Sequence, residues 1–231
     1  MDKLLFTTAN GLQINIERAL EIDSTTDLKN KWYGLNSTDN FGCCTYLYKK
    51  YGYPATVEEF YNKYVTDEKD ENLKTYGRTE DFIMKYAGIL AKRDNNRFSI
   101  DDYYSYIIKK LMYDTIEGLK WESKLNDYIN SKGFTTKPPT IYEDTTLGID
   151  IKVYKDNNLK CLVQCKPISF FRGNSNYSLI NDRMKAITKE QKAVNAFGVP
   201  VFYCIYEKNK NEWKLNKKGG RCFKLKDLIT Q

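Results

Sequence analysis

The chain has 231 residues, 41% of them apolar, with 37 Lys and Arg against 30 Asp and Glu and no His. The missing imidazole excludes Ser-His-Asp and Cys-His catalysis, H-E-x-x-H zinc enzymes and histidine-based pH switches. Any chemistry must therefore use carboxylates, amides, Lys, Tyr or Cys.

No apolar run approaches the roughly 18 residues that span a bilayer, and the first residues do not form the long apolar stretch of a signal peptide. We therefore expect a cytoplasmic, intracellular protein with no membrane partner. The six Cys form no C-x-x-C pair, and four of them lie among apolar, strand-like residues. This pattern indicates reduced thiols in the core rather than a Cys-rich zinc site.

Positive charge is concentrated in the C-terminal third. Residues 155–231 carry 16 Lys and Arg against 6 Asp and Glu, a net charge of +10, whereas residues 1–154 carry 21 against 24, a net charge of −3. A basic surface favours a polyanionic partner. A solvated Lys-rich surface without a partner explains the charge equally well.

Short helices are expected over the first 110 residues. Capping residues open three helices: Thr56 (to about residue 65), Thr79 (to about 93) and Ser99 (to about 113). Twelve of the 19 Tyr lie between residues 46 and 113, many beside Lys or Arg. These rings either stack on bases or pack half-buried between helices. We interpret residues 1–110 as a mainly helical domain that recognises the substrate.

The pattern changes after residue 110. We expect, in chain order, a helix over 111–131, strands near 134–136, 149–154 and 159–166, a helix over 178–196 and a strand over 199–206. The order α-β-β-β-α-β predicts an α/β (α+β) domain over residues 111–231, with a mixed central sheet flanked by helices.

Glu122 occupies an unusual place on the helix over 111–131. At 100° per residue it lies about 60° from Leu119 and Leu125 and about 20° from Ile129, within the apolar stripe. A buried carboxylate without a partner costs several kcal/mol or takes up a proton. Glu122 therefore needs a cation or donor beside it, and Gly118 one turn earlier leaves room for one. The alternative is a Glu that reaches solvent or forms a structural ion pair.

Asp150, Gln164 and Lys166 are polar residues in a hairpin of otherwise apolar strands. Asp150 faces away from the Ile on either side, and Gln164 shares a face with Lys166. With a three-residue loop over 156–158, paired residue numbers sum to 314 and Asp150 lies opposite Gln164. A two-residue loop would place the acid and the amide on opposite faces. The arrangement therefore requires an odd loop or a β-bulge, with Asn in the left-handed conformation.

Together with Glu122, these residues suit a divalent-metal site. Two carboxylates and one amide oxygen are hard ligands of the kind that Mg²⁺ prefers, and Mn²⁺ can replace it. Lys166 can position or deprotonate a water, or neutralise charge on a phosphate transition state. Hydrolysis of a phosphodiester is then feasible without imidazole.

Four segments resemble the PD-(D/E)xK nuclease superfamily, most closely its Mrr-type restriction-endonuclease branch. Residues 118–122, Gly-Leu-Lys-Trp-Glu, look like the G-x-x-[FW]-E helix of that branch, and residues 133–134, Gly-Phe, like the G-[FY] that follows. Residues 148–150, Gly-Ile-Asp, and 163–166, Val-Gln-Cys-Lys, look like its G-[IV]-D and V-Q-x-K strands. The resemblance covers roughly residues 113–207, and residues 1–110 match no family that we can name.

The resemblance implies a restriction-endonuclease-like α-β-β-β-α-β core, one or two Mg²⁺ ions and hydrolysis of DNA. By matching position, Asp150 and Gln164 are metal ligands, Lys166 is the catalytic lysine, and Glu122 is an accessory acid or second-metal ligand. The chain departs from the superfamily pattern twice. Gln164 replaces the commoner acid, and Gly-Ile at 148–149 stands where many members have a proline. Both departures are shared by the Mrr branch.

Further DNA contacts are expected after the catalytic strand. Arg172, Asn174 and Asn176 follow it directly and can reach phosphates or base edges, while Lys185 and Lys189 lie on the next helix. A purely structural loop and a solvated helix face are the alternatives.

The sequence thus predicts a Mg²⁺-dependent endodeoxyribonuclease. The alternative is a non-catalytic nucleic-acid-binding or partner-binding protein on the same fold. Because cutting both strands usually needs two active sites, a homodimer is compatible with the first function, although no motif indicates one.

Overall fold

The computed structural model describes residues 4–167, 177–207, 212–217 and 221–224. Side chains are described for these residues except 141, 166–167, 177–183 and those from 205 onward. Arg172, Asn174 and Asn176, which we expect to contact DNA, lie outside the described residues. The chain divides into two compact units, Met1–Leu119 and Lys120–Gln231, which we call unit 1 and unit 2 and describe separately.

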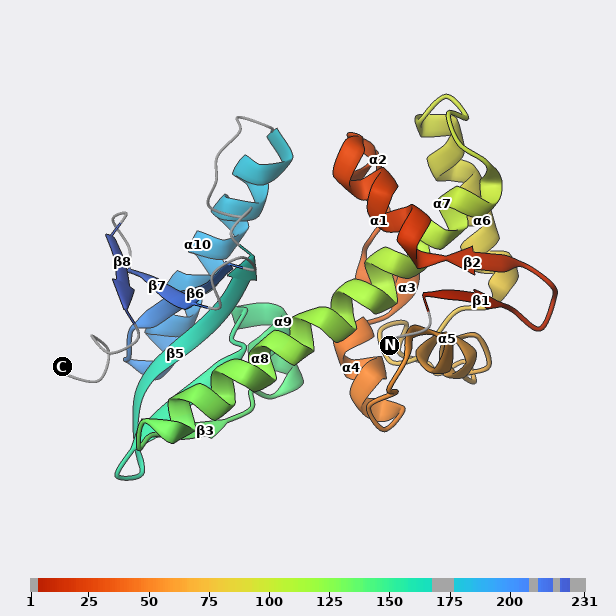
Figure 1. Cartoon of the computed structure of the whole chain (residues 1–231). Helices are drawn as coiled ribbons and strands as arrows, with labels where there is room; N and C mark the ends of the chain where they lie inside the picture. Colours follow the sequence, from red (N-terminus) through yellow and green to blue (C-terminus); the bar gives the residue numbers. More distant parts are fainter. Residues whose placement is uncertain (1–3, 168–176, 208–211, 218–220, 225–231) are drawn as a thin grey trace. The chain divides into compact units, whose positions relative to one another are not determined.

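Unit 1 consists of a small hairpin and short helices (Figure 1). Strands β1 (Leu5–Thr7) and β2 (Gln13–Asn15) pair antiparallel. The helices are α1 (Ile16–Thr25), α2 (Leu28–Trp32), α3 (Thr38–Phe41), α4 (Cys44–Lys50), α5 (Val57–Val65), α6 (Glu80–Arg93) and α7 (Ile100–Ile108). The three predicted caps are confirmed, because Thr56, Thr79 and Ser99 each accept a hydrogen bond from the backbone N–H three residues later.

One helical run covers residues 100–131. A single π-helical turn, η1 (Lys109–Tyr113), separates α7 from α8 (Asp114–Ser131), and no local pattern predicted it. Lys109 is buried, and its Nζ lies 2.5 Å from Asp23 Oδ2 and 3.0 Å from Asp114 Oδ1. A buried charge is tolerated when it is paired in this way, and here the pair joins α1 to the helical run.

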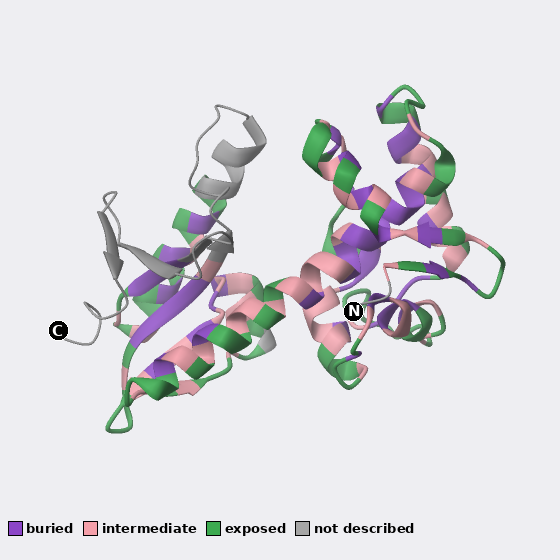
Figure 2. Cartoon of the chain, in the orientation of Figure 1, coloured by how far each residue is buried: buried purple, intermediate pink, exposed green. Residues whose placement is uncertain are grey.

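Tyrosines form part of the core of unit 1, whose buried residues are purple in Figure 2. Five are fully buried: Tyr61, Tyr64, Tyr103, Tyr104 and Tyr106. Their hydroxyls have partners inside the unit; for example, the hydroxyls of Tyr61 and Tyr104 lie 2.9 Å apart. Packing between helices therefore explains these tyrosines, and stacking on bases does not.

Unit 2 contains a mixed six-stranded sheet with helices, which confirms the predicted α/β class. The strand order is β3 (Thr135–Lys137), β4 (Ile151–Lys155), β5 (Asn158–Pro167), β6 (Val201–Glu207), β7 (Glu212–Lys217) and β8 (Arg221–Lys224). Strands β5 and β6 are parallel, and the other neighbours are antiparallel. Helix α9 (Ile141–Leu147) precedes β4, and α10 (Tyr177–Phe197) precedes β6. Among the described residues, no helix is long and apolar enough to cross a membrane.

The sheet carries an apolar core on each face. On one face, Val163 of β5 packs with Leu125 of α8. On the other, Leu162 packs with Leu147 of α9 and Ala193 of α10. Successive residues of β5 therefore face α8 and the pair α9 and α10 in turn, as the two-residue period of a strand requires.

The β4–β5 hairpin reaches the required register through a bulge. Its loop has two residues, Asp156 and Asn157, rather than the expected three, and both have positive φ (51° and 61°), as a type I′ turn requires. The register then shifts at Lys160, which the ladder skips, and Ile151 pairs with Val163. The inner part of the hairpin therefore has the predicted pairing, with a left-handed Asn in the turn.

Candidate active site

Asp150 stands between α9 and β4. Gly148 ends α9 in the left-handed conformation (φ +67°), and the Ile149 N–H donates to the carbonyl of Glu143. The strand expected over 149–154 is present but begins two residues later, because Gly148 caps α9 and β4 spans Ile151–Lys155. Ile149 packs in the core under α9 and α10, whereas Ile151 packs in the core under α8. The chain changes faces at Asp150.

The Asp150 carboxylate is hydrogen-bonded to the backbone of β5. Its Oδ2 accepts a hydrogen bond from the backbone N–H of Cys165 at 2.5 Å, and its own N–H donates to Val163 O at 2.9 Å. A hydrogen bond to a carboxylate is roughly twice as strong as one between neutral groups. Asp150 is thus held beside residues 163–165, the neighbourhood that the predicted pairing with Gln164 requires.

Gln164 is only 1% exposed. Its Nε2 donates to Leu147 O at 3.4 Å, which fixes the orientation of the amide, because the reverse orientation would set two oxygens against each other. In the described part of the chain, Gln164 Oε1 accepts no hydrogen bond. Buried polar atoms nearly always have a partner, and an exception calls for a water or an ion. Oε1 is therefore the atom of this site that an added ligand would satisfy.

The donor set at this point fits Mg²⁺ or Mn²⁺. A carboxylate and an amide oxygen are hard ligands, and they come from Asp150 and from the strand to which it is bonded. Within the described residues, no group of three or more Asp, Glu, Cys or His side chains could hold a metal ion. Asp150 and Gln164 would therefore hold the ion with waters in its remaining positions, as Mg²⁺ commonly does.

Glu122 comes to the sheet from the other face. It lies on α8, about 20° around the helix from Ile129, which packs in the α8-side core. Its side chain is half-buried, so the apolar stripe overstated its burial. Gly118 was expected to leave room for a neighbour of Glu122. In the described structure a Cβ at Gly118 meets nothing within 4 Å. Gln164 and Glu122 therefore stand on opposite faces of β5.

Lys166 continues β5 two residues beyond Gln164. Its backbone pairs with Ile205 of the parallel strand β6, and its side chain lies outside the described part of the molecule. The role of catalytic lysine therefore stays a prediction from sequence.

Lys189 belongs to the immediate surroundings of the site. Its Nζ donates to Thr145 O at 2.7 Å, and its Cδ lies 3.2 Å from the position of a Cβ on Gly148. A cation at the C-terminal end of a helix is favourable, so Lys189 holds the end of α9 against α10. Lys185, one turn earlier on α10, is exposed. Both lysines were expected to contact DNA, and the structure gives Lys189 a contact within the protein, to Thr145 O.

Sequence reasoning missed a second buried polar pair beside Gln164. Tyr203 of β6 is the register partner of Gln164, and its hydroxyl donates to Glu190 Oε2 of α10 at 3.1 Å. Burial and the Glu190 carboxylate raise the pKa of the Tyr203 phenol above its usual value, so it stays a donor. Glu190 stands between Ala186 and Ala193 on the buried side of α10. The helical-wheel argument that selected Glu122 would also have found it.

The comparisons identify no relative of this chain. No family model matches it, nor does any curated protein or solved structure. The likeness to Mrr-type nucleases therefore rests on its own residues over 113–207.

Proposed function

We propose that the protein is a Mg²⁺-dependent DNA endonuclease of the PD-(D/E)xK superfamily, closest to its Mrr-type branch. The observation that carries the proposal is the buried amide of Gln164, whose Oε1 has no hydrogen-bond donor in the described structure, on the strand that holds the Asp150 carboxylate. The order α8-β3-β4-β5-α10-β6, with β5 parallel to β6, supports a restriction-endonuclease-like core into which α9 is inserted.

In this proposal the chain's own groups prepare the site. Asp150 and Gln164 would hold the ion, which when bound polarises the scissile phosphate and lowers the pKa of a bound water. The Cys165 N–H orients the Asp150 carboxylate, and the Leu147 carbonyl orients the Gln164 amide. Lys166 would neutralise charge on the phosphate or take a proton from the water. Glu122, on the opposite face of β5 from Gln164, is not part of this site. A homodimer would supply two such sites for two strands.

Substrate and metal requirements provide the first test. Supercoiled, linear, single-stranded and branched DNA, together with RNA, are incubated with Mg²⁺, Mn²⁺, Ca²⁺ or EDTA, and the product ends are mapped. We expect DNA cleavage with Mg²⁺ or Mn²⁺ and little with Ca²⁺, whose larger, looser coordination shell suits this chemistry poorly. Cleavage that persists in EDTA would contradict the proposal.

Substitutions provide the second test. Asp150→Asn and Lys166→Ala should each lower the cleavage rate on the order of 10²–10⁴-fold, as expected for loss of a group that organises proton transfer or charge. Gln164→Leu should also be inactive, because it removes the amide oxygen that would bind the ion. Lys160→Ala, in the bulge of the same strand, is the control. Full activity in Asp150→Asn would contradict the nuclease assignment. Salt-sensitive DNA binding, with no cutting by the parent protein or by the variants, would favour the non-catalytic alternative.

A further inference from the structure

Lysine side chains of unit 2 lie over aromatic rings. The ammonium-to-centroid distance is 4.1 Å for Lys124 over Trp121, 5.3 Å for Lys132 over Tyr128 and 5.6 Å for Lys155 over Phe134. An ammonium within about 6 Å of a ring centroid is attracted by the negative face of the ring. We call these six residues the lysine–aromatic strip.

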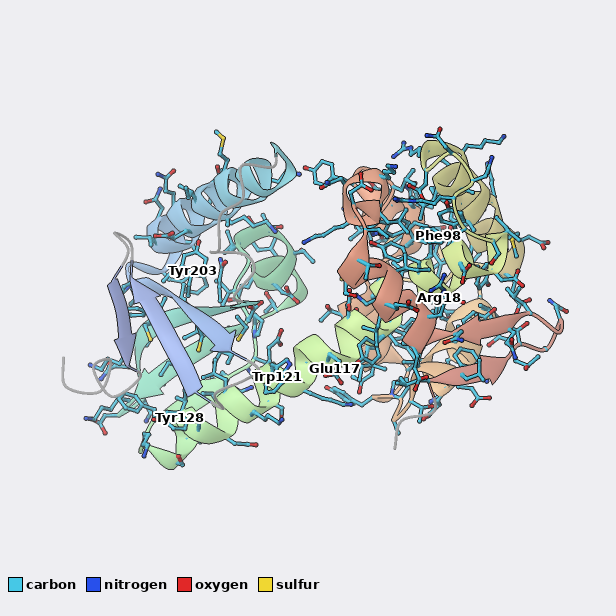
Figure 3. The ribbon with its side chains drawn as sticks, turned by 45° about the horizontal axis from the view of Figure 1, so that its top comes forward. Arg18, Phe98, Glu117, Trp121, Tyr128 and Tyr203 are labelled. Atoms are coloured by element: carbon cyan, nitrogen blue, oxygen red, sulfur yellow. The ribbon has the colours of Figure 1, made fainter. Side chains whose placement is uncertain are left out.

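The strip follows one flank of α8 and continues onto the sheet. Trp121, Lys124 and Tyr128 are three or four residues apart, which places them on one side of the helix, and Figure 3 shows Trp121 and Tyr128 along it. Tyr128 and Phe134, of the second and third pairs, both pack against the core under α8. The helical part alone, from Trp121 to Tyr128, is about 10 Å long at about 1.5 Å per residue.

The strip lysines differ from the cations that lie over rings in unit 1. Each of those also has a strong polar partner: Arg18, Lys50, Arg97 and Lys110 pair with carboxylates, and Arg78 binds backbone carbonyls. Within the described residues, Lys124, Lys132 and Lys155 form no ion pair. Their charge is therefore ordered by a ring but not neutralised by the protein.

We propose that the lysine–aromatic strip binds a single strand of nucleic acid. Ammonium groups along a groove or ridge contact successive phosphates, and aromatic side chains beside them stack on bases, which is how proteins hold single strands. The three rings are half-buried, and the lysine lies over the ring in each pair, so a base would stack on a ring as its lysine moves from the ring to a phosphate. An acidic protein would explain the lysines but not a ring beside each one. If this nucleic acid is the DNA that is cut at Asp150 and Gln164, the inference rests on the proposed function.

Binding is measured by fluorescence anisotropy of a labelled oligo-dT in EDTA, over a series of salt concentrations. The strip variant Lys124→Gln/Lys132→Gln/Lys155→Gln is compared with Lys49→Gln/Lys85→Gln/Lys92→Gln, which removes the same charge from exposed lysines of unit 1. For a single strand, each phosphate contact makes the slope of log K against log salt steeper by about 0.7, so each contact removed makes it shallower by that amount. We expect the slope of the strip variant to fall by about 2, while the control keeps the wild-type slope.

The rings are tested separately. Trp121→Ala and Tyr128→Ala should each weaken binding roughly 10-fold, since base stacking on a side chain contributes about 1–3 kcal/mol. Oligo-U in place of oligo-dT shows whether the strand is DNA or RNA; strip-dependent binding of either supports the strip, and preference for dT supports its link to the substrate.

The strip and the nuclease assignment can fail independently. Equal losses in the two triple variants, or a slope unchanged in both, would overturn the strip. Strip-dependent binding without any metal-dependent cutting would retain the strip and remove the nuclease. Metal-dependent cutting by a strip variant that binds DNA like the wild type would retain the nuclease and remove the strip.

Discussion

A methyl group on Gly148 would lie 2.9 Å from Nε2 of Gln164 and 3.2 Å from Cδ of Lys189. The residue thus meets two requirements at once. Its φ of +67° is one that side chains with a Cβ rarely adopt, and its missing side chain leaves space for the Gln164 amide and the Lys189 stem. The glycine of the Gly-Ile-Asp segment is therefore part of the site's geometry.

Replacing this glycine should harm both stability and activity. Gly148→Ala should cost about 1–2 kcal/mol for the left-handed backbone alone, and it should displace Gln164 and lower DNA cleavage. Gly118→Ala is the matched control, because Gly118 lies inside α8 with open space around it in the described structure. That variant should gain roughly 0.5–1 kcal/mol. Urea unfolding measures both; equal stability of the two variants would contradict the role given to Gly148.

Asp94 should make unit 1 sensitive to acid. Its side chain is fully buried and accepts hydrogen bonds from Lys31 at 2.6 Å, Arg97 at 2.8 Å and Tyr103 at 2.8 Å. Burial alone would raise the pKa of the Asp94 carboxyl, but these partners outweigh it, and the pKa is lowered. The stability that ionised Asp94 contributes is therefore present above the carboxyl's pKa in the unfolded chain and is lost as pH falls through the folded pKa.

The test is a stability profile against pH. At pH 7, Asp94→Asn should lower the free energy of unfolding by about 1–3 kcal/mol. The difference from the parent protein should shrink as pH falls below 4, where both side chains become neutral. A difference that stays constant down to acid unfolding would show that the Asp94 charge does not contribute.

The Tyr203–Glu190 contact should be energetically coupled. Removing the hydroxyl with Tyr203→Phe, or the charge with Glu190→Gln, should lower stability, and a double-mutant cycle should give a coupling of about 0.5–3 kcal/mol. The pairing of Tyr203 with Gln164 on neighbouring strands further predicts that both variants disturb cleavage. Strict additivity of the two stability changes would contradict the contact.

The buried cysteines should resist alkylation. Burial raises the pKa of the Cys161 thiol to about 12 and raises that of Cys204 as well, and both lie in the α8-side core. Since only the thiolate reacts, Cys161 should have roughly 10³-fold less reactive species at pH 8 than an exposed thiol. Pulse labelling followed by mass spectrometry should modify the half-buried Cys43 and Cys165 first. Early labelling of Cys161 in the native protein would contradict this order.

Local signals predicted much of the fold. The caps at Thr56, Thr79 and Ser99 are confirmed because a cap depends on residues within one turn. Helix α9 was missed although its capping box, Thr140 with Glu143, stands in the sequence. Two prolines just before it suggested a break, and the helix is too short to show a clear apolar period. Strands β7 and β8 were missed because their many lysines suggested a solvated tail.

The site could be predicted only as far as local pattern reaches. Asp150 and Gln164 stand out because each is polar among apolar strand residues, and the structure places the Asp150 carboxylate against the backbone N–H of Cys165, the residue after Gln164. The contact of Lys189 with α9 could not be predicted, since it depends on how two separate helices pack. The burial of Glu122 was overestimated, because a helical wheel gives direction but not depth.

The bulge at Lys160 separates two parts of the hairpin that would otherwise share one register. In a regular ladder, a residue gained or lost at the tip would move every inner side chain to the opposite face of the sheet. Here the loss of one residue near Lys160 would straighten the strand while the residues beyond it kept their partners. The hairpin tip can therefore change in length through evolution, or carry a label inserted by design, without moving Gln164 to the other face of the sheet.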